Sequence, residues 1–190
     1  DLHSFPTRRS SDLLSTDLEP TGPQADDGAR FRRSRLLRRA ARTLATRPSP
    51  AASRLHLERA LDLIEQSRRL ARSIPASEHY SAVWEDGAVD SDMSDIYWRC
   101  DEYDLAVEAS ERAVTSYLSE DDRATAAQEL SFIARLHAER LDQPGQREAA
   151  QKAIARGRGL LAHPRWQEHE AVKNLARIEE YLEAHPSEAD

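Results

Sequence analysis

The apolar residues of this chain recur at helical spacing from Arg30 almost to the C-terminus, and this periodicity limits the fold more than any other feature. Spacings of three and four residues place side chains on one face of an α-helix. One such stripe comprises Leu57, Ala60, Leu61, Ile64, Ala71 and Ile74. Prolines interrupt the pattern at intervals, and no segment alternates as a half-buried β-strand would. The pattern therefore predicts an all-α fold.

Seven helices are expected, spanning residues 30–46, 50–74, 78–100, 102–118, 120–141, 146–162 and 165–184. Ser49 suits the N-cap of the second helix, and Pro50 suits its first turn because proline lacks the amide hydrogen that would go unpaired there. Ser119 with Asp122 resembles a capping box for the fifth helix. Short connections force successive helices to pack antiparallel, so the sequence predicts helix hairpins in series.

Two segments carry small and aromatic residues in a pattern that resembles tetratricopeptide repeats. In MSDIYWRCDEYDLAVEASERAV, residues 93–114, the positions that match are Ser94, Tyr97, Tyr103, Ala106 and Ala113. A weaker unit follows in residues 133–157, with Ala134, His137, Ala150, Ile154 and Gly157. The usual glycine is Ser94 or Ala134, and the two units are not spaced at the family's repeat of about 34 residues. The resemblance implies a short right-handed solenoid of antiparallel helix hairpins.

A narrower resemblance concerns residues 83–114, 123–154 and 171–185, which look like the C-terminal helical repeats of actinobacterial helix-turn-helix transcriptional regulators. It implies a regulatory role and a DNA-binding domain upstream of this sequence. Abundant arginine and alanine with only two lysines also suggest a bacterium with GC-rich DNA.

In tetratricopeptide architecture the first helix of each pair lines a concave groove that binds a protein or peptide. The resemblance implies that this groove is formed by Ala88, Ser91, Asp95, Trp98 and Arg99 from one unit and by Gln128, Ser131, Arg135 and Glu139 from the next. Trp98 beside two charged residues has the make-up of a binding hot spot. Burial of Trp98 between neighbouring hairpins is the equal alternative.

Charge is divided into two opposed blocks. Residues 30–72 hold 13 arginines and three acidic residues, whereas residues 78–104 hold nine acidic residues and one arginine. Such blocks can pair within the fold, between protomers of a homodimer, or with separate partners. The basic helix 29–45 leaves a nucleic-acid-binding role open as an alternative function, and a structural self-association segment is a further alternative.

Nothing in the sequence points to an enzyme, a cofactor or a metal site. Phosphate-binding glycine loops and nucleophile motifs are missing. His163 and His169 are six residues apart and would point in different directions on one helix, and His137 falls in an apolar stripe. Cys100 is the only cysteine, so no internal disulfide can form. We expect a cytoplasmic protein with no membrane partner, since no apolar run is long enough to cross a bilayer.

The ends of the sequence are expected to lie outside the folded part. Residues 1–13, DLHSFPTRRSSDL, match the translation of a widely used sequencing adapter and are treated as non-biological. Residues 14–28 are expected to be a disordered linker, 29–185 the helical-repeat domain, and 186–190 a disordered tail. Because the chain has no initiator methionine, we expect it to be a fragment of a longer protein.

Overall fold

The computed structural model describes residues 27–45, 50–75 and 80–186, and every regular element in these ranges is a helix. The α-helices are α2 (Asp27–Ala45), α3 (Pro50–Arg72), α4 (Ala82–Trp98), α5 (Tyr103–Ser119), α6 (Arg123–Ala138), α7 (Gln146–Leu160) and α8 (Glu170–Ala184). A short 3₁₀ helix, η1 (Pro164–Trp166), precedes α8. The predicted all-α fold with seven helices is confirmed for this part of the chain. Residues 1–26 and 187–190, which include the expected adapter segment and most of the linker and tail, lie outside the described residues.

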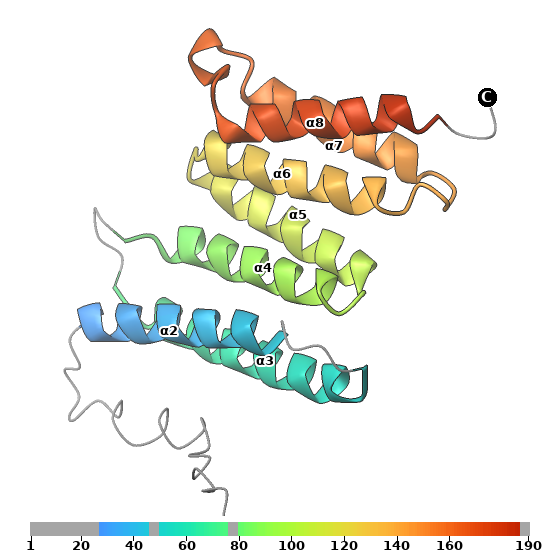
Figure 1. Cartoon of the computed structure of the whole chain (residues 1–190). Coiled ribbons are helices and arrows are strands. Elements are labelled where there is room, and N and C mark those ends of the chain that lie inside the picture. The colour runs from blue at the N-terminus through green and yellow to red at the C-terminus, as the bar shows by residue number, and fades with distance from the viewer. Residues whose placement is uncertain (1–26, 46–49, 76–79, 187–190) are drawn as a thin grey trace, which may run out of the picture.

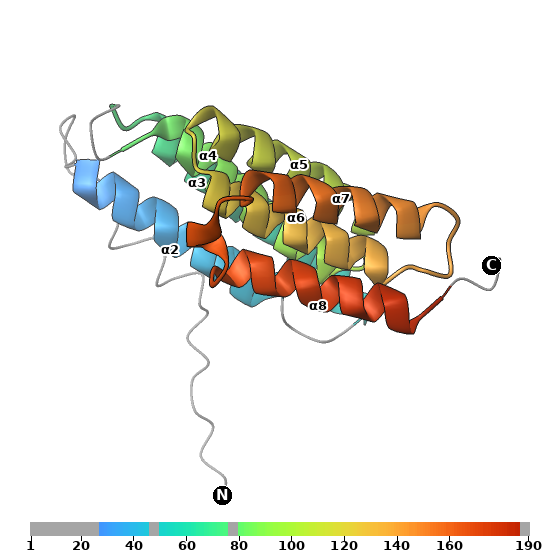
Figure 2. The same cartoon turned by 90° about the horizontal axis from the view of Figure 1, so that it is seen from above.

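The helices pack as consecutive pairs, α2 with α3, α4 with α5 and α6 with α7, and α8 then packs on the last pair. Figure 1 shows α2, α4, α6 and α8 in front, with α3, α5 and α7 behind them. In the view from above, α7 and α8 lie on opposite sides of α6 (Figure 2). We call the surface formed by α2, α4, α6 and α8 the front face. The right-handed twist of a solenoid stays a prediction.

Four predicted helix starts are three or more residues from the observed ones. Helix α2 begins at Asp27, before residue 30, and side-chain caps set the other three boundaries. Helix α4 begins at Ala82, since the Ser81 hydroxyl accepts a hydrogen bond from the amide of Trp84. Helix α6 is capped by Asp122, which accepts from Thr125 N, whereas Ser119 belongs to the end of α5. The predicted last helix is divided into η1 and α8, because His169 caps α8. The predicted cap Ser49 lies outside the described residues.

The turns after α4 and α5 are built alike. Each closes with a hydrogen bond of 2.9 Å that crosses the helix end, from Glu102 N to Tyr97 O and from Asp122 N to Tyr117 O. This bond requires a left-handed residue just before the donor, and Asp101 and Asp121 take that role with φ of 63° and 55°. Aspartate adopts this region more readily than most residues with a Cβ. The repeated turn keeps the connections short, which makes the neighbouring helices antiparallel.

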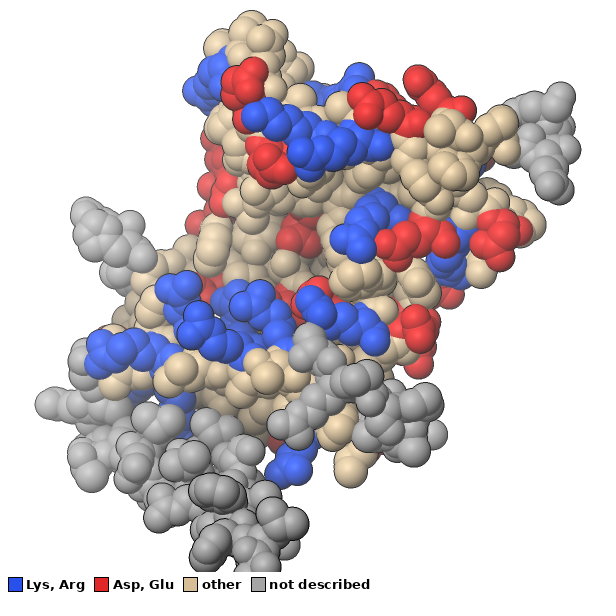
Figure 3. Space-filling model, in the orientation of Figure 1, with Lys and Arg blue, Asp and Glu red and all other residues tan. Residues whose placement is uncertain are grey.

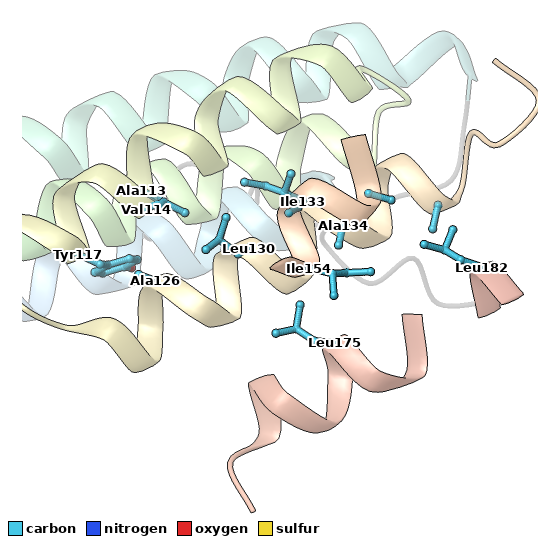
Figure 4. Close-up of a cluster of buried hydrophobic side chains, with 13 residues drawn as sticks. Ala113, Val114, Tyr117, Ala126, Leu130, Ile133, Ala134, Ile154, Leu175 and Leu182 are labelled. Atoms are coloured by element: carbon cyan, nitrogen blue, oxygen red, sulfur yellow. The ribbon is translucent and has the colours of Figure 1, made fainter. Parts of the chain in front are cut away.

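The largest apolar cluster lies between α5, α6, α7 and α8, where Leu130 and Ile133 of α6 occupy the centre (Figure 4). The small residues that the repeat pattern requires are buried, namely Ser94, Ala106, Ala113, Ala134 and Ala150. Gly87 marks a close approach that the pattern did not identify. A methyl group added there would lie 3.0 Å from Cβ of Ser116, so glycine allows α4 and α5 to pack together.

The acidic residues of α4 are neutralised mainly by arginines of the basic block. Glu85, Asp90 and Asp92 are buried, and Arg38 of α2 binds both Glu85, at 3.1 Å, and Asp92. Arg42 reaches the second oxygen of Asp92 at 3.3 Å.

Asp90 is bound by Arg68 of α3, at 2.9 Å, and by Arg112 of α5, at 3.1 Å. Asp86 pairs with Arg72 of α3 at 2.9 Å. Arginines from three helices therefore converge on α4. Of the alternatives left open by the charge blocks, pairing within the fold applies to these residues.

Replacing Arg38 should be far more damaging than replacing Arg42, although both bind Asp92. The Arg38 side chain is 18% exposed and serves two buried carboxylates, whereas that of Arg42 is 50% exposed. Losing one partner of a buried pair leaves uncompensated charge, so Arg38→Ala should lower the free energy of unfolding by roughly 3 kcal/mol. Arg42→Ala should cost less than about 1 kcal/mol, as exposed pairs do. Urea unfolding measures both, and equal losses would contradict the buried network.

Candidate functional site

The predicted groove residues come from α4 and from α6 with its C-terminal end, two helices that lie at the front of the molecule with α5 behind them (Figure 1). Arg99, Gln128, Arg135 and Glu139 are exposed, Ser91, Asp95 and Trp98 are half-buried, and Ala88 and Ser131 are buried. The structure brings Trp98, Arg135 and Glu139 together through side-chain contacts, whereas Ser91 contacts α6 separately, through Glu129. Ala88 and Ser131 belong to the packed interior and offer little surface to a partner.

The Trp98 side chain links the C-terminal ends of α4 and α6. Its indole Nε1 donates to the carboxylate of Glu139 at 2.8 Å, and its ring meets Phe132 edge-on at 5.8 Å between centroids. The Arg135 guanidinium lies 4.4 Å from the ring centroid, within the range of a cation–π interaction. Arg135 also bonds Glu139 at 2.8 Å. We call these four residues the Trp98 cluster.

This arrangement changes what Trp98 can offer a partner. Its only hydrogen-bond donor is already used by Glu139, and Arg135 lies over the ring. Trp98 therefore connects neighbouring hairpins and is half-buried, so part of its surface stays open. On the other side of the cluster, Arg99 lies 5.7 Å from the ring centroid and bonds Asp95 at 2.8 Å.

A buried carboxyl group that sequence reasoning missed lies beneath this face. Glu129 of α6 is only 8% exposed and receives the hydroxyl of Ser91 of α4 at 2.6 Å. Its second oxygen lies 3.2 Å from the hydroxyl of Ser110 of α5. The burial of Glu129 could have been predicted from the sequence, since Glu129 lies on the same helix stripe as Ala126 and Ile133, three and four residues away.

The hydroxyl groups behind Glu129 form a chain that constrains its protonation. Ser110 Oγ lies 2.8 Å from Ser94 Oγ, which in turn lies 2.6 Å from the carbonyl oxygen of Ala106. Each serine hydroxyl has one hydrogen to donate. If Glu129 is protonated, it donates to Ser110, Ser110 donates to Ser94 and Ser94 donates to Ala106, so every contact holds one hydrogen. An ionised Glu129 needs the Ser110 hydrogen, and one of the remaining contacts then lacks its donor.

Electrostatics favour the same state. Burial raises the pKa of Glu129, and the negative charges of Asp92 and Asp95 add to this effect. The hydrogen bonds from Ser91 and Ser110 oppose the shift but leave the pKa above its usual range. A carboxyl whose pKa is raised on folding contributes stability below its unfolded pKa, and that stability is lost as the pH rises through the folded pKa.

Glu129→Gln should therefore stabilise the protein at high pH. The amide can accept from Ser91 and donate to Ser110, as the protonated acid does, but it cannot ionise. We expect the gain to appear as the pH rises above the usual glutamate pKa, about 4.3, and to vanish below it, because only an ionisable side chain loses stability there. Urea unfolding across this range gives the difference. The matched control is Glu180→Gln on the exposed side of α8, and a pH-independent effect of Glu129→Gln would refute the protonated network.

The three histidines considered in the sequence analysis make local hydrogen bonds. His163 Nδ1 accepts the amide of Arg165 at the start of η1, and His169 Nδ1 accepts that of Ala171 at the start of α8, both at 3.2 Å. His137 is half-buried and its Nδ1 lies 2.6 Å from Gln146 Oε1. Among the described residues, no group of three or more histidine, cysteine or acidic side chains is placed to hold a metal ion. In the same residues, no helix is long and apolar enough to cross a membrane.

Comparison with protein-family models, with curated proteins and with solved structures found no match to this chain. The likeness to tetratricopeptide repeats and to the regulators therefore rests on the residues quoted above.

Proposed function

We propose that the chain is a non-catalytic module that binds a protein or peptide on its front face, as the regulatory part of a larger cytoplasmic protein. The observation that supports this most directly is the junction of α4 and α6. Side chains from two hairpins meet there, with the Trp98 cluster partly open at the surface and Ser91 bonded to the buried Glu129. Figure 3 shows the front face hollowed between the part formed by α6 and α8 and the part formed by α2 and α4.

The hollow suits an extended or helical peptide more than a small molecule. Its walls come from helices far apart in sequence, which is how repeat proteins build long binding surfaces. The Trp98 cluster, where the C-terminal ends of α4 and α6 meet, supplies a partly open ring together with the charges of Arg135 and Glu139, and Arg99 lies beside the ring. Aromatic rings flanked by charges are enriched where partners bind tightly.

A peptide selection tests the proposal. The full chain is immobilised, a random peptide library is selected on it, and hydrogen–deuterium exchange locates the bound peptide. Protection should concentrate on the exposed surface of α4 and α6, because the proposed contacts lie there. Protection confined to α3, α5 and α7, or no binder above the background of an unrelated helical protein, would count against the proposal.

Two substitutions then distinguish an aromatic residue that anchors the peptide from a charged residue at the edge of the site. Trp98→Ala should weaken binding of the selected peptide by about 2 kcal/mol, as loss of an aromatic anchor does, whereas Arg135→Ala should mainly slow association. Arg156 of α7 is the matched control, since it also pairs with a glutamate, Glu111, but belongs to the rear helices. Arg156→Ala should leave binding unchanged. The free energy of unfolding is measured for each variant, and wild-type affinity in a folded Trp98→Ala variant would remove Trp98 from the site.

A further inference from the structure

The exposed side of α2 carries four arginines in one row. Arg32, Arg35, Arg39 and Arg42 are spaced by three, four and three residues, which places them along a single stripe of the helix. All four are exposed. We call this row the arginine ridge. Figure 3 shows it as a band of basic side chains that follows α2 along the front face.

The ridge borders a shallow depression that is strongly unbalanced in charge. Five arginines and one acidic residue line it, the fifth arginine being Arg38 and the acidic residue Asp92. Asp92 is engaged by Arg38 and Arg42, and Arg38 also binds Glu85 behind the ridge. In the part of the chain that the structure describes, neither Arg35 nor Arg39 makes an ion pair. Positive charge therefore remains on the surface after the buried acids of α4 are neutralised.

An apolar side chain lies within the same depression. Leu36 is 47% exposed and stands between the ridge arginines, next to Arg32 and Arg39 on the helix surface. A ligand that fits this surface needs anionic groups at intervals of about one helical turn and an apolar group between them. A partner helix with carboxylates three and four residues apart and one leucine has this pattern. Guanidinium groups suit it because they bind carboxylates in a bidentate manner.

Nucleic acid fits the ridge less well. Single strands are bound through basic grooves that also offer open aromatic rings for base stacking. Phe31 is the only aromatic residue of α2, and it already meets Tyr80 edge-on at 5.9 Å and is covered by Arg35 at 5.6 Å from its centroid.

We propose that the arginine ridge binds an acidic amphipathic helix of a partner protein, with Arg35 and Arg39 as the central contacts and Leu36 against an apolar side chain. This inference rests on the proposed protein-binding function and names the chemistry of the partner. The site is separate from the Trp98 cluster, since its residues come from α2 and not from the junction of α4 and α6.

The probe is an end-capped, fluorescent helical peptide of about the length of α2, roughly 28 Å at 1.5 Å per residue. It carries glutamates at the spacing of the ridge and one leucine between them. Fluorescence anisotropy is measured with the full chain, with Arg35→Glu/Arg39→Glu and with Arg35→Gln/Arg39→Gln. The control is Arg59→Glu/Arg69→Glu on α3, where both arginines are exposed and the change in net charge is the same as in the ridge variant.

The charge-reversed ridge variant should bind at least about tenfold more weakly, the glutamine variant should lose less, and the α3 control should stay close to wild type. Thermal unfolding verifies that each variant is folded. Equal losses in the ridge and α3 variants would show that only net charge matters and would overturn the proposal. So would equal binding of a peptide with lysines in place of glutamates, or tighter ridge-dependent binding of a single-stranded oligonucleotide. If the acidic peptide fails to bind while library-selected peptides still map to α4 and α6, this inference is wrong and the proposed function stands.

Discussion

The buried acidic residues of α4 require positively charged partners from the helices packed around them. Taking a carboxylate out of water costs several kcal/mol, and only close pairing recovers that cost. Glu85, Asp90 and Asp92 can therefore be buried only where arginines arrive from α2, α3 and α5 together. This requirement adds to the apolar packing around α4. The N-terminal hairpin is held to the repeats both by these ion pairs and by an apolar cluster in which Ala41 of α2 and Ile64 of α3 pack with Val89 and Ile96 of α4.

The C-terminal half depends on a different balance. Between α5, α6, α7 and α8 the contacts are apolar, and small residues such as Ala134 and Ala150 let the helices approach closely. Glu129 lies between the ion pairs around α4 and the apolar cluster of α5 to α8, and its buried carboxyl group has hydroxyl groups as hydrogen-bond partners. Its protonated state joins α4, α5 and α6 without requiring a counter-ion. On the surface above, the Trp98 cluster links α4 to α6, so the shape of the front face there is set by side chains.

Periodicity and breakers predicted every described α-helix but not the short 3₁₀ helix η1, because they depend on local chemistry that one sequence displays. The predicted starts of α4, α6 and α8 were wrong because more than one polar residue near each start could serve as the N-cap. The residues that do so, Ser81, Asp122 and His169, depend on where the preceding helix ends. Trp98 could be singled out, but Glu139 and Phe132, its partners from the next hairpin, are brought to it only by the tertiary fold. For the same reason, the sequence alone could not show whether the basic and acidic blocks pair with each other within the fold.

Helix α2 carries more arginines than are needed to neutralise the buried acids of α4. Arg38 points toward α4 and is needed to neutralise Glu85 and Asp92, and Arg42 supplements it. Arg35 lies over the ring of Phe31, and among the described residues neither Arg35 nor Arg39 forms an ion pair, so neutralising these acids does not account for them. Like charges along one stripe of a helix repel each other and tend to weaken it. An anionic partner helix that binds these arginines would offset their mutual repulsion. Leu36, which is exposed next to the row, is the apolar residue that this partner helix would contact.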